Sequence, residues 1–125
     1  MENQGVEKRK FPRVYFTKED KILASITFPG TQKKPIEAGV MNLSQEGICL
    51  TYRKNDDIEV SEKDVLILTQ LKGLTPELFQ EELKIQIKWI INEAFFDHDQ
   101  IGCKIVNASE SYRELVRTAP SRRNG

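Results

Sequence analysis

The most constraining feature of the sequence is a run of alternating side chains between residues 83 and 91. Every second position of this run is apolar, and most positions between carry lysine or glutamine. Successive side chains of a β-strand point to opposite faces, so a period of two predicts a half-buried strand. The apolar face, which we interpret as core, comprises Leu83, Ile85, Ile87, Trp89 and Ile91.

Other short β signals flank this run, and turn residues separate them. The expected strands are 22–28, 36–43, 48–52, 65–68 and 101–106. Thr75, Pro76 and the acidic residues that follow predict one or two helical turns, or a loop, over 75–82.

One helix is expected near the C-terminal end. Ser109 or Ser111 can cap it, and Pro120 would end it. Five or six short strands with intervening turns and one short helix predict an all-β domain, either a small antiparallel barrel or a sandwich.

The charge balance limits the classes of partner. The 125 residues suit a single domain, and Lys plus Arg equal Asp plus Glu at 19 each. A general polyanion binder would carry a basic excess, so any anion site must be local.

The chain shows no signal peptide and no apolar run near the roughly 20 residues of a membrane helix, which favours a cytoplasmic protein. Cys49 and Cys103 lack Cys-x-x-Cys spacing, so they predict buried free thiols rather than a zinc or redox site.

A basic cluster near the start supplies the local excess. Arg9 and Arg13 stand four residues apart, with Lys8 and Lys10 close by and Pro12 stiffening the spacing. Arginine captures phosphate oxygens, or the O6 and N7 edge of guanine, in a bidentate fashion. Considered alone, the cluster is more typical of solvated basic residues on a tail than of a ligand site.

A polar cluster follows about thirty residues later. Asn42 and Ser44 would point to the same side if the strand continues through them, and Gly47 would let a ligand approach the backbone. Considered alone, residues 44–47 are also typical of a type I turn.

Together the clusters form Arg-x-x-x-Arg followed by Asn-x-Ser-x-x-Gly on an all-β chain, which resembles the PilZ domain. The resemblance runs from Lys8 to Val106, and residues 101–105 with the preceding Trp89 strand resemble the family's closing hairpin. It implies a six-stranded antiparallel β-barrel that binds cyclic di-GMP. The ligand-binding residues it implies are Arg9, Arg13, Asn42, Ser44 and Gly47, with Lys8 and Lys10 as further candidates.

The resemblance also implies how the chain is divided and what it does. Residues 1–7 would be a flexible tail, 8–118 the barrel domain and 119–125 a polar tail. The nucleotide would order residues 8–13 and relay the signal to an unidentified downstream protein, without enzymatic activity, cofactor or membrane insertion. Lys8, just before the first arginine, favours a stacked pair of nucleotides.

Three alternatives remain. A PilZ-like adaptor would bind protein and no nucleotide. A small barrel for single-stranded nucleic acid would need a basic groove and several stacking aromatics. An enzyme or metal site would rest on residues 97–99, which contain the only histidine, His98, and which we interpret as an exposed turn.

Overall fold

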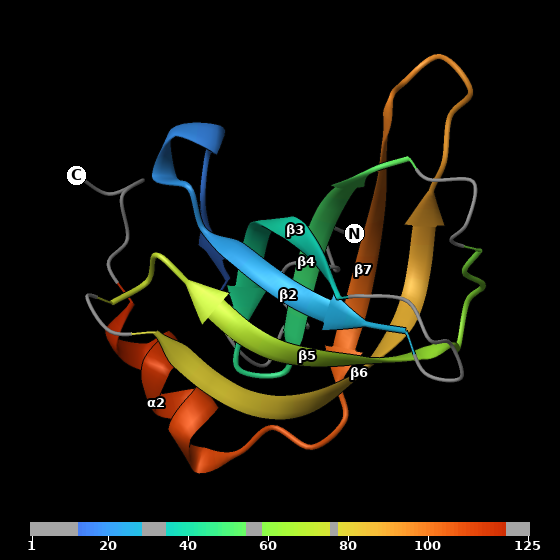
Figure 1. Cartoon of the computed structure of the whole chain (residues 1–125). Helices are drawn as coiled ribbons and strands as arrows, with labels where there is room; N and C mark the ends of the chain where they lie inside the picture. The colour runs from blue at the N-terminus through green and yellow to red at the C-terminus, as the bar shows by residue number, and fades with distance from the viewer. Residues whose placement is uncertain (1–12, 29–34, 55–58, 76–77, 120–125) are drawn as a thin grey trace, which may run out of the picture.

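The computed structural model describes residues 13–28, 35–54, 59–75 and 78–119 (Figure 1). Within these ranges the chain forms seven strands, a short 3-10 helix and one α-helix. In chain order they are β1 Val14–Tyr15, η1 Lys18–Asp20, β2 Leu23–Thr27, β3 Ile36–Ser44, β4 Gly47–Arg53, β5 Val65–Lys72, β6 Phe79–Ile91, β7 His98–Ile105 and α2 Glu110–Thr118.

Six of the described strands close a barrel. Their order is β3-β2-β5-β6-β7-β4, and β4 pairs back with β3, all in antiparallel fashion. Strand β1 is an addition to β3, where Val14 lies opposite Leu43. The predicted all-β fold, a small six-stranded antiparallel β-barrel with a C-terminal helix, is confirmed.

The interior is filled by aliphatic side chains from every barrel strand. Ala24, Leu50, Leu68, Ile87 and Ile101 are fully buried there. Closure of the sheet removes the open edges that an isolated sheet would expose.

Helix α2 packs at one end of the barrel through Tyr112, Leu115 and Val116, all buried (Figure 1). Its N-cap is Ser109, whose hydroxyl accepts a hydrogen bond from the Tyr112 amide at 3.1 Å. Of the two predicted caps, Ser109 is the one used. No helix in the described part of the chain is long and apolar enough to span a membrane.

The prediction of helical turns or a loop over 75–82 is wrong from Phe79 onward. Strand β6 begins at Phe79, which lies opposite Leu71 of β5. Cross-strand pairing with β5 outweighs the local helix-start signals of Thr75 and Pro76, because such propensities are weak against tertiary contacts. Pro76 itself lies outside the described residues.

The interpretation of Trp89 and Ile91 as core residues is also wrong, because they are 39% and 42% exposed. Ile87 lies opposite Cys103, and Trp89 lies opposite Gly102. Ile87 and Trp89 are two residues apart on β6, whereas their partners on β7 are adjacent, so β6 contains one extra residue here. This β-bulge reverses the inside–outside alternation. Ile87 therefore points inward and Trp89 outward.

Candidate functional site

Two bulges bring the polar cluster and Trp89 to the same outer face of the barrel. The bulge in β3 falls between Val40 and Asn42, and that in β6 between Ile87 and Trp89. Residues directly opposite in an antiparallel sheet point to the same face. The register accordingly gives one lateral row across four strands, namely Asn42, Cys49, Gly102 and Trp89.

Arg13 lies over this row. Its Nη1 donates a hydrogen bond of 2.7 Å to Oδ1 of Asn42. A Cβ built on Gly47 would lie 3.3 Å from Nη2 of Arg13 and 3.5 Å from Oγ of Ser44. The glycine thus leaves room for the guanidinium to lie against the backbone of β4.

The structure brings four of the predicted site residues together: Arg13, Asn42, Ser44 and Gly47. Arg9, Lys8 and Lys10 lie outside the described residues. The predicted turn over 42–47 is shorter than expected, because β3 continues through Ser44 and only Gln45 and Glu46 form the turn. Because the strand continues through both residues, Asn42 and Ser44 point to the same face, as predicted.

The turn after β3 is held from below by α2. The buried hydroxyl of Tyr112 donates to the Ser44 carbonyl at 2.7 Å and approaches the Gly47 carbonyl at 3.5 Å. Burial raises the pKa of Tyr112, so the hydroxyl keeps its proton and remains a donor. The Ser44 hydroxyl also accepts from the Glu46 amide at 3.3 Å.

Trp89 lies directly against the backbone of β7. A Cβ built on Gly102 would come within 2.1 Å of the indole ring, closer than real Cβ contacts. Glycine at this strand position is therefore what admits the ring, consistent with the use of strand glycines where another group approaches closely. The outcome is a partly exposed aromatic surface beside Arg13.

These residues line a hollow of about 220 Å³, which we call the site hollow. Its charged side chains include three cations and one carboxylate, so the surroundings are locally basic although the chain is neutral. The complete lining is Arg13, Ser44, Glu46, Gly47, Cys49, Lys88, Trp89, Gly102, Cys103 and Lys104.

Sequence reasoning missed Lys88, Trp89 and Lys104. The only local signal was Gly102 inside an otherwise apolar strand, which marks a close approach without saying what approaches. Lys88 and Lys104 reach the site hollow through the pairing of β6 with β7, which the sequence pattern alone does not determine.

Cys103 and His98 are the other reactive side chains that the sequence singled out. Burial raises the pKa of Cys103 to about 12, so its thiol stays protonated at neutral pH. His98, expected in a turn, begins β7, and its Nδ1 lies 2.9 Å from a carboxylate oxygen of Asp97. No group of three or more potential metal ligands occurs among the residues described.

No protein-family model and no curated protein sequence matches the chain. Solved structures do. The PilZ domain of YcgR from Escherichia coli, with c-di-GMP, is 11% identical with a TM-score of 0.65, and the match covers 88% of this chain and 86% of that chain.

Two longer proteins are similar to most of this chain. MotI, the inhibitor of motility of Bacillus subtilis, is 15% identical with a TM-score of 0.64, covering 87% of this chain and 47% of that chain. The MrkH–c-di-GMP complex of K. pneumonia is 12% identical with a TM-score of 0.65, covering 88% and 49%. This chain spans about half the length of MotI and MrkH. At these identities the likeness shows the fold, and that fold is the one of the YcgR PilZ domain.

Proposed function

We propose that this protein is a cyclic di-GMP receptor that holds the nucleotide on the outer face of β3, β4, β7 and β6. The observation that carries the proposal is the assembly of Arg13, Asn42, Ser44 and Gly47 beside Trp89. This assembly occurs on a fold shared with solved complexes of c-di-GMP.

The chemistry of the site hollow matches such a ligand. Cyclic di-GMP carries two phosphate charges and two guanines. The planar guanidinium of Arg13 can donate two parallel hydrogen bonds to either a phosphate or a guanine. Lys88 and Lys104 add point charges for phosphate. The exposed ring of Trp89 offers a surface for a base, and base–aromatic stacking is worth about 1–3 kcal/mol per base.

The site hollow is smaller than a typical small-molecule pocket, about 220 Å³ against roughly 300–1,000 Å³. The nucleotide would therefore extend over the surface and be covered by the segment before Arg13. In this account Arg9 supplies the second fork, Lys8 and Lys10 add charge, and ordering of residues 8–13 relays the signal to a partner protein. Arg13 would exchange its bond to Asn42 for bonds to the ligand.

A PilZ-like adaptor without nucleotide is the second candidate. One observation favours it. The Arg13 guanidinium is already hydrogen-bonded to Asn42 and lies close to Gly47, where the nucleotide would otherwise bind. In an adaptor this contact would permanently hold the residue before β1 against β3.

Calorimetric titration distinguishes the two candidates. We expect saturable heat with cyclic di-GMP and none with GTP or cyclic di-AMP. Arg13→Ala should weaken binding at least tenfold, since charge-assisted hydrogen bonds are worth about 1.5–3 kcal/mol. Arg117→Ala is the matched control, because Arg117 pairs only with Glu110 and Glu114 on α2 among the described residues.

The titration also yields the number of nucleotides bound. Two per chain would support the stacked pair inferred from Lys8, and one would contradict it. Absence of heat at tens of micromolar protein would refute the receptor and favour the adaptor.

A further inference from the structure

A second and larger hollow, which we call the end groove, lies at the barrel end opposite α2. It has a volume of about 790 Å³ and is bordered by β1, η1, β3, β4 and the connection between β6 and β7. Figure 1 shows η1 and this connection projecting from the same end, away from α2. Of the proposed nucleotide-site residues in the described ranges, only Asn42 lines it.

Two exposed aromatic side chains line the end groove. Tyr15 on β1 is 44% exposed, and Phe96 on the β6–β7 connection is 54% exposed. Phe95 packs edge-on against Phe96, with ring centroids 4.9 Å apart. Exposed aromatic rings grouped around a concave surface are typical of protein interfaces.

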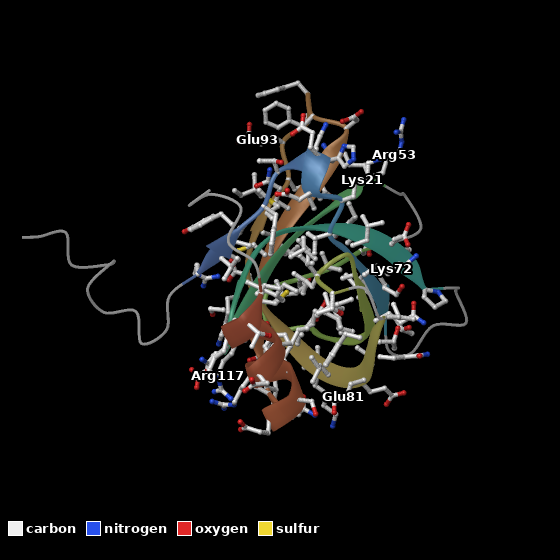
Figure 2. The ribbon with its side chains drawn as sticks, turned by 90° about the vertical axis from the view of Figure 1, so that its left-hand side faces the viewer. Lys21, Arg53, Lys72, Glu81, Glu93 and Arg117 are labelled. Atoms are coloured by element: carbon white, nitrogen blue, oxygen red, sulfur yellow. The ribbon has the colours of Figure 1, made fainter. Side chains whose placement is uncertain are left out.

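Three basic side chains line the end groove: Lys18, Lys21 and Arg53. No ion pair within the described ranges involves any of them. Figure 2 shows Lys21 and Arg53 at the same end of the barrel as Glu93, far from Arg117 on α2.

Two acidic side chains also line the end groove. Glu37 forms an ion pair with Lys72 at 2.6 Å, and Asp97 lies 2.9 Å from Nδ1 of His98. The hydrogen bond with His98 and, to a smaller extent, the charge of Arg53 lower the pKa of Asp97. Lys18, Lys21 and Arg53 thus outnumber Asp97, the one carboxylate of the lining without a Lys or Arg ion pair in the described residues, and this positive excess favours an acidic occupant.

Two buried polar atoms without hydrogen-bond partners lie beside the end groove. Tyr52 lines the groove and is 4% exposed, and its hydroxyl has no hydrogen-bond partner among the described residues. Oδ1 of Asp99, which lies opposite Tyr52 on β7, is likewise buried without such a partner. The two atoms are neighbours, so the Asp99 carboxylate is the acceptor nearest in the sheet to the Tyr52 hydroxyl.

We propose that the end groove docks an acidic segment of a partner protein. The segment inserts an aromatic or aliphatic side chain between Tyr15 and Phe96 and places carboxylates on Lys18, Lys21 and Arg53. This docking does not depend on nucleotide binding. The two sites nevertheless adjoin, because β1 begins directly after Arg13 and Tyr15 lies opposite Asn42.

Selection from a random twelve-residue peptide library on the intact chain tests the proposal. Enriched peptides, synthesised and measured by fluorescence anisotropy, should combine aspartate or glutamate with an aromatic or aliphatic residue. Their affinity should fall at least tenfold in Lys18→Glu/Lys21→Glu and in Phe96→Ser. An enriched set without acidic residues would overturn the proposal.

Two controls match these substitutions. Val106→Ser removes a side chain that is 53% exposed, nearly as exposed as Phe96, and Lys84→Glu reverses an exposed charge on β6. Both should bind the peptides within twofold of the unaltered chain. Equal losses in the controls, or binding unaffected by the groove variants, would contradict the assignment. So would dimers in sedimentation that Phe96→Ser abolishes, which would identify a second copy as the occupant.

Discussion

At the scale of single residues, Gly102 determines whether an aromatic ring can lie on the barrel face. A Cβ there would meet three indole atoms of Trp89 at 2.1–2.5 Å, so any larger residue must displace the ring. Gly39 offers a contrast, because its Cβ would meet a methyl group of Thr51 at 3.3 Å, a contact that small shifts relieve.

We therefore expect Gly102→Ala to expose Trp89 further and to weaken cyclic di-GMP binding roughly tenfold, within the range of one lost stacking contact. Trp89 is the only tryptophan, so its fluorescence reports this site alone. Emission should move to longer wavelength in Gly102→Ala and stay unchanged in Gly39→Ala. An identical spectrum in both variants would refute the role given to Gly102.

Two buried tyrosines allow a matched test of the hydroxyl under the candidate site. The Tyr112 hydroxyl donates to the Ser44 carbonyl, whereas that of Tyr52 has no partner among the described residues. Tyr112→Phe should lower the free energy of unfolding by about 1–3 kcal/mol, because it leaves a buried acceptor without its donor. Tyr52→Phe should cost less than about 0.5 kcal/mol or stabilise the fold. Urea denaturation measures both, and equal costs would contradict the assignment.

At the scale of elements, α2 is capped by Ser109, whose hydroxyl also donates to a carboxylate oxygen of Glu81 on β6. Ser109→Ala should therefore destabilise the fold by about 0.5–2 kcal/mol, the usual cost of losing an N-cap. Ser111 lies exposed in the first helical turn, and alanine there is a good helix former. Ser111→Ala should be neutral or stabilising in urea denaturation. A larger loss for Ser111→Ala would place the cap there instead.

The strands were predictable where local pattern and pairing agree. The expected 36–43 and 48–52 correspond to β3 and β4; β3 extends one residue further at its C-terminal end, and β4 one residue further at each end. The start of β6 was not predictable, because Phe79 is held by β5 across a turn rather than by its own neighbours in sequence. The bulges in β3 and β6 could not be predicted from the sequence for the same reason, because a bulge is defined only by the pairing with a partner strand.

At the scale of the whole molecule, the candidate site was predictable in part. Asn42, Ser44 and Gly47 lie within six residues, so a motif reveals them, and Arg13 follows from its spacing to Arg9. Trp89 was misplaced because the β6 bulge reverses its face. Its neighbours Lys88 and Lys104 come from two strands whose register follows from barrel closure.

The barrel should lose stability in alkaline solution. Burial raises the pKa of Cys103 from 9.0 to about 12, and burial with the nearby Asp99 carboxylate raises that of Tyr52 from 10.0 to about 12. Above pH 9 the unfolded chain releases these protons while the folded chain retains them. The unfolded state then binds fewer protons, so the free energy of unfolding decreases with pH.

Urea midpoints measured between pH 8 and 11.5 should fall steadily above pH 9. Tyr52→Phe removes one of the two groups, so its midpoints should fall less steeply above pH 10. Midpoints that stay constant through pH 11.5 would contradict the burial of these groups.

The most direct test of the central claim is nuclear magnetic resonance of the ¹⁵N-labelled chain during titration with cyclic di-GMP. We expect saturable shifts of the Trp89 indole N–H and of the Gly47 and Gly102 amides, with the Lys72 amide unmoved. Gly47, Trp89 and Gly102 all line the site hollow of about 220 Å³, whereas Lys72 does not. Saturable shifts confined to the end groove, or none at twofold excess of nucleotide over millimolar protein, would contradict it.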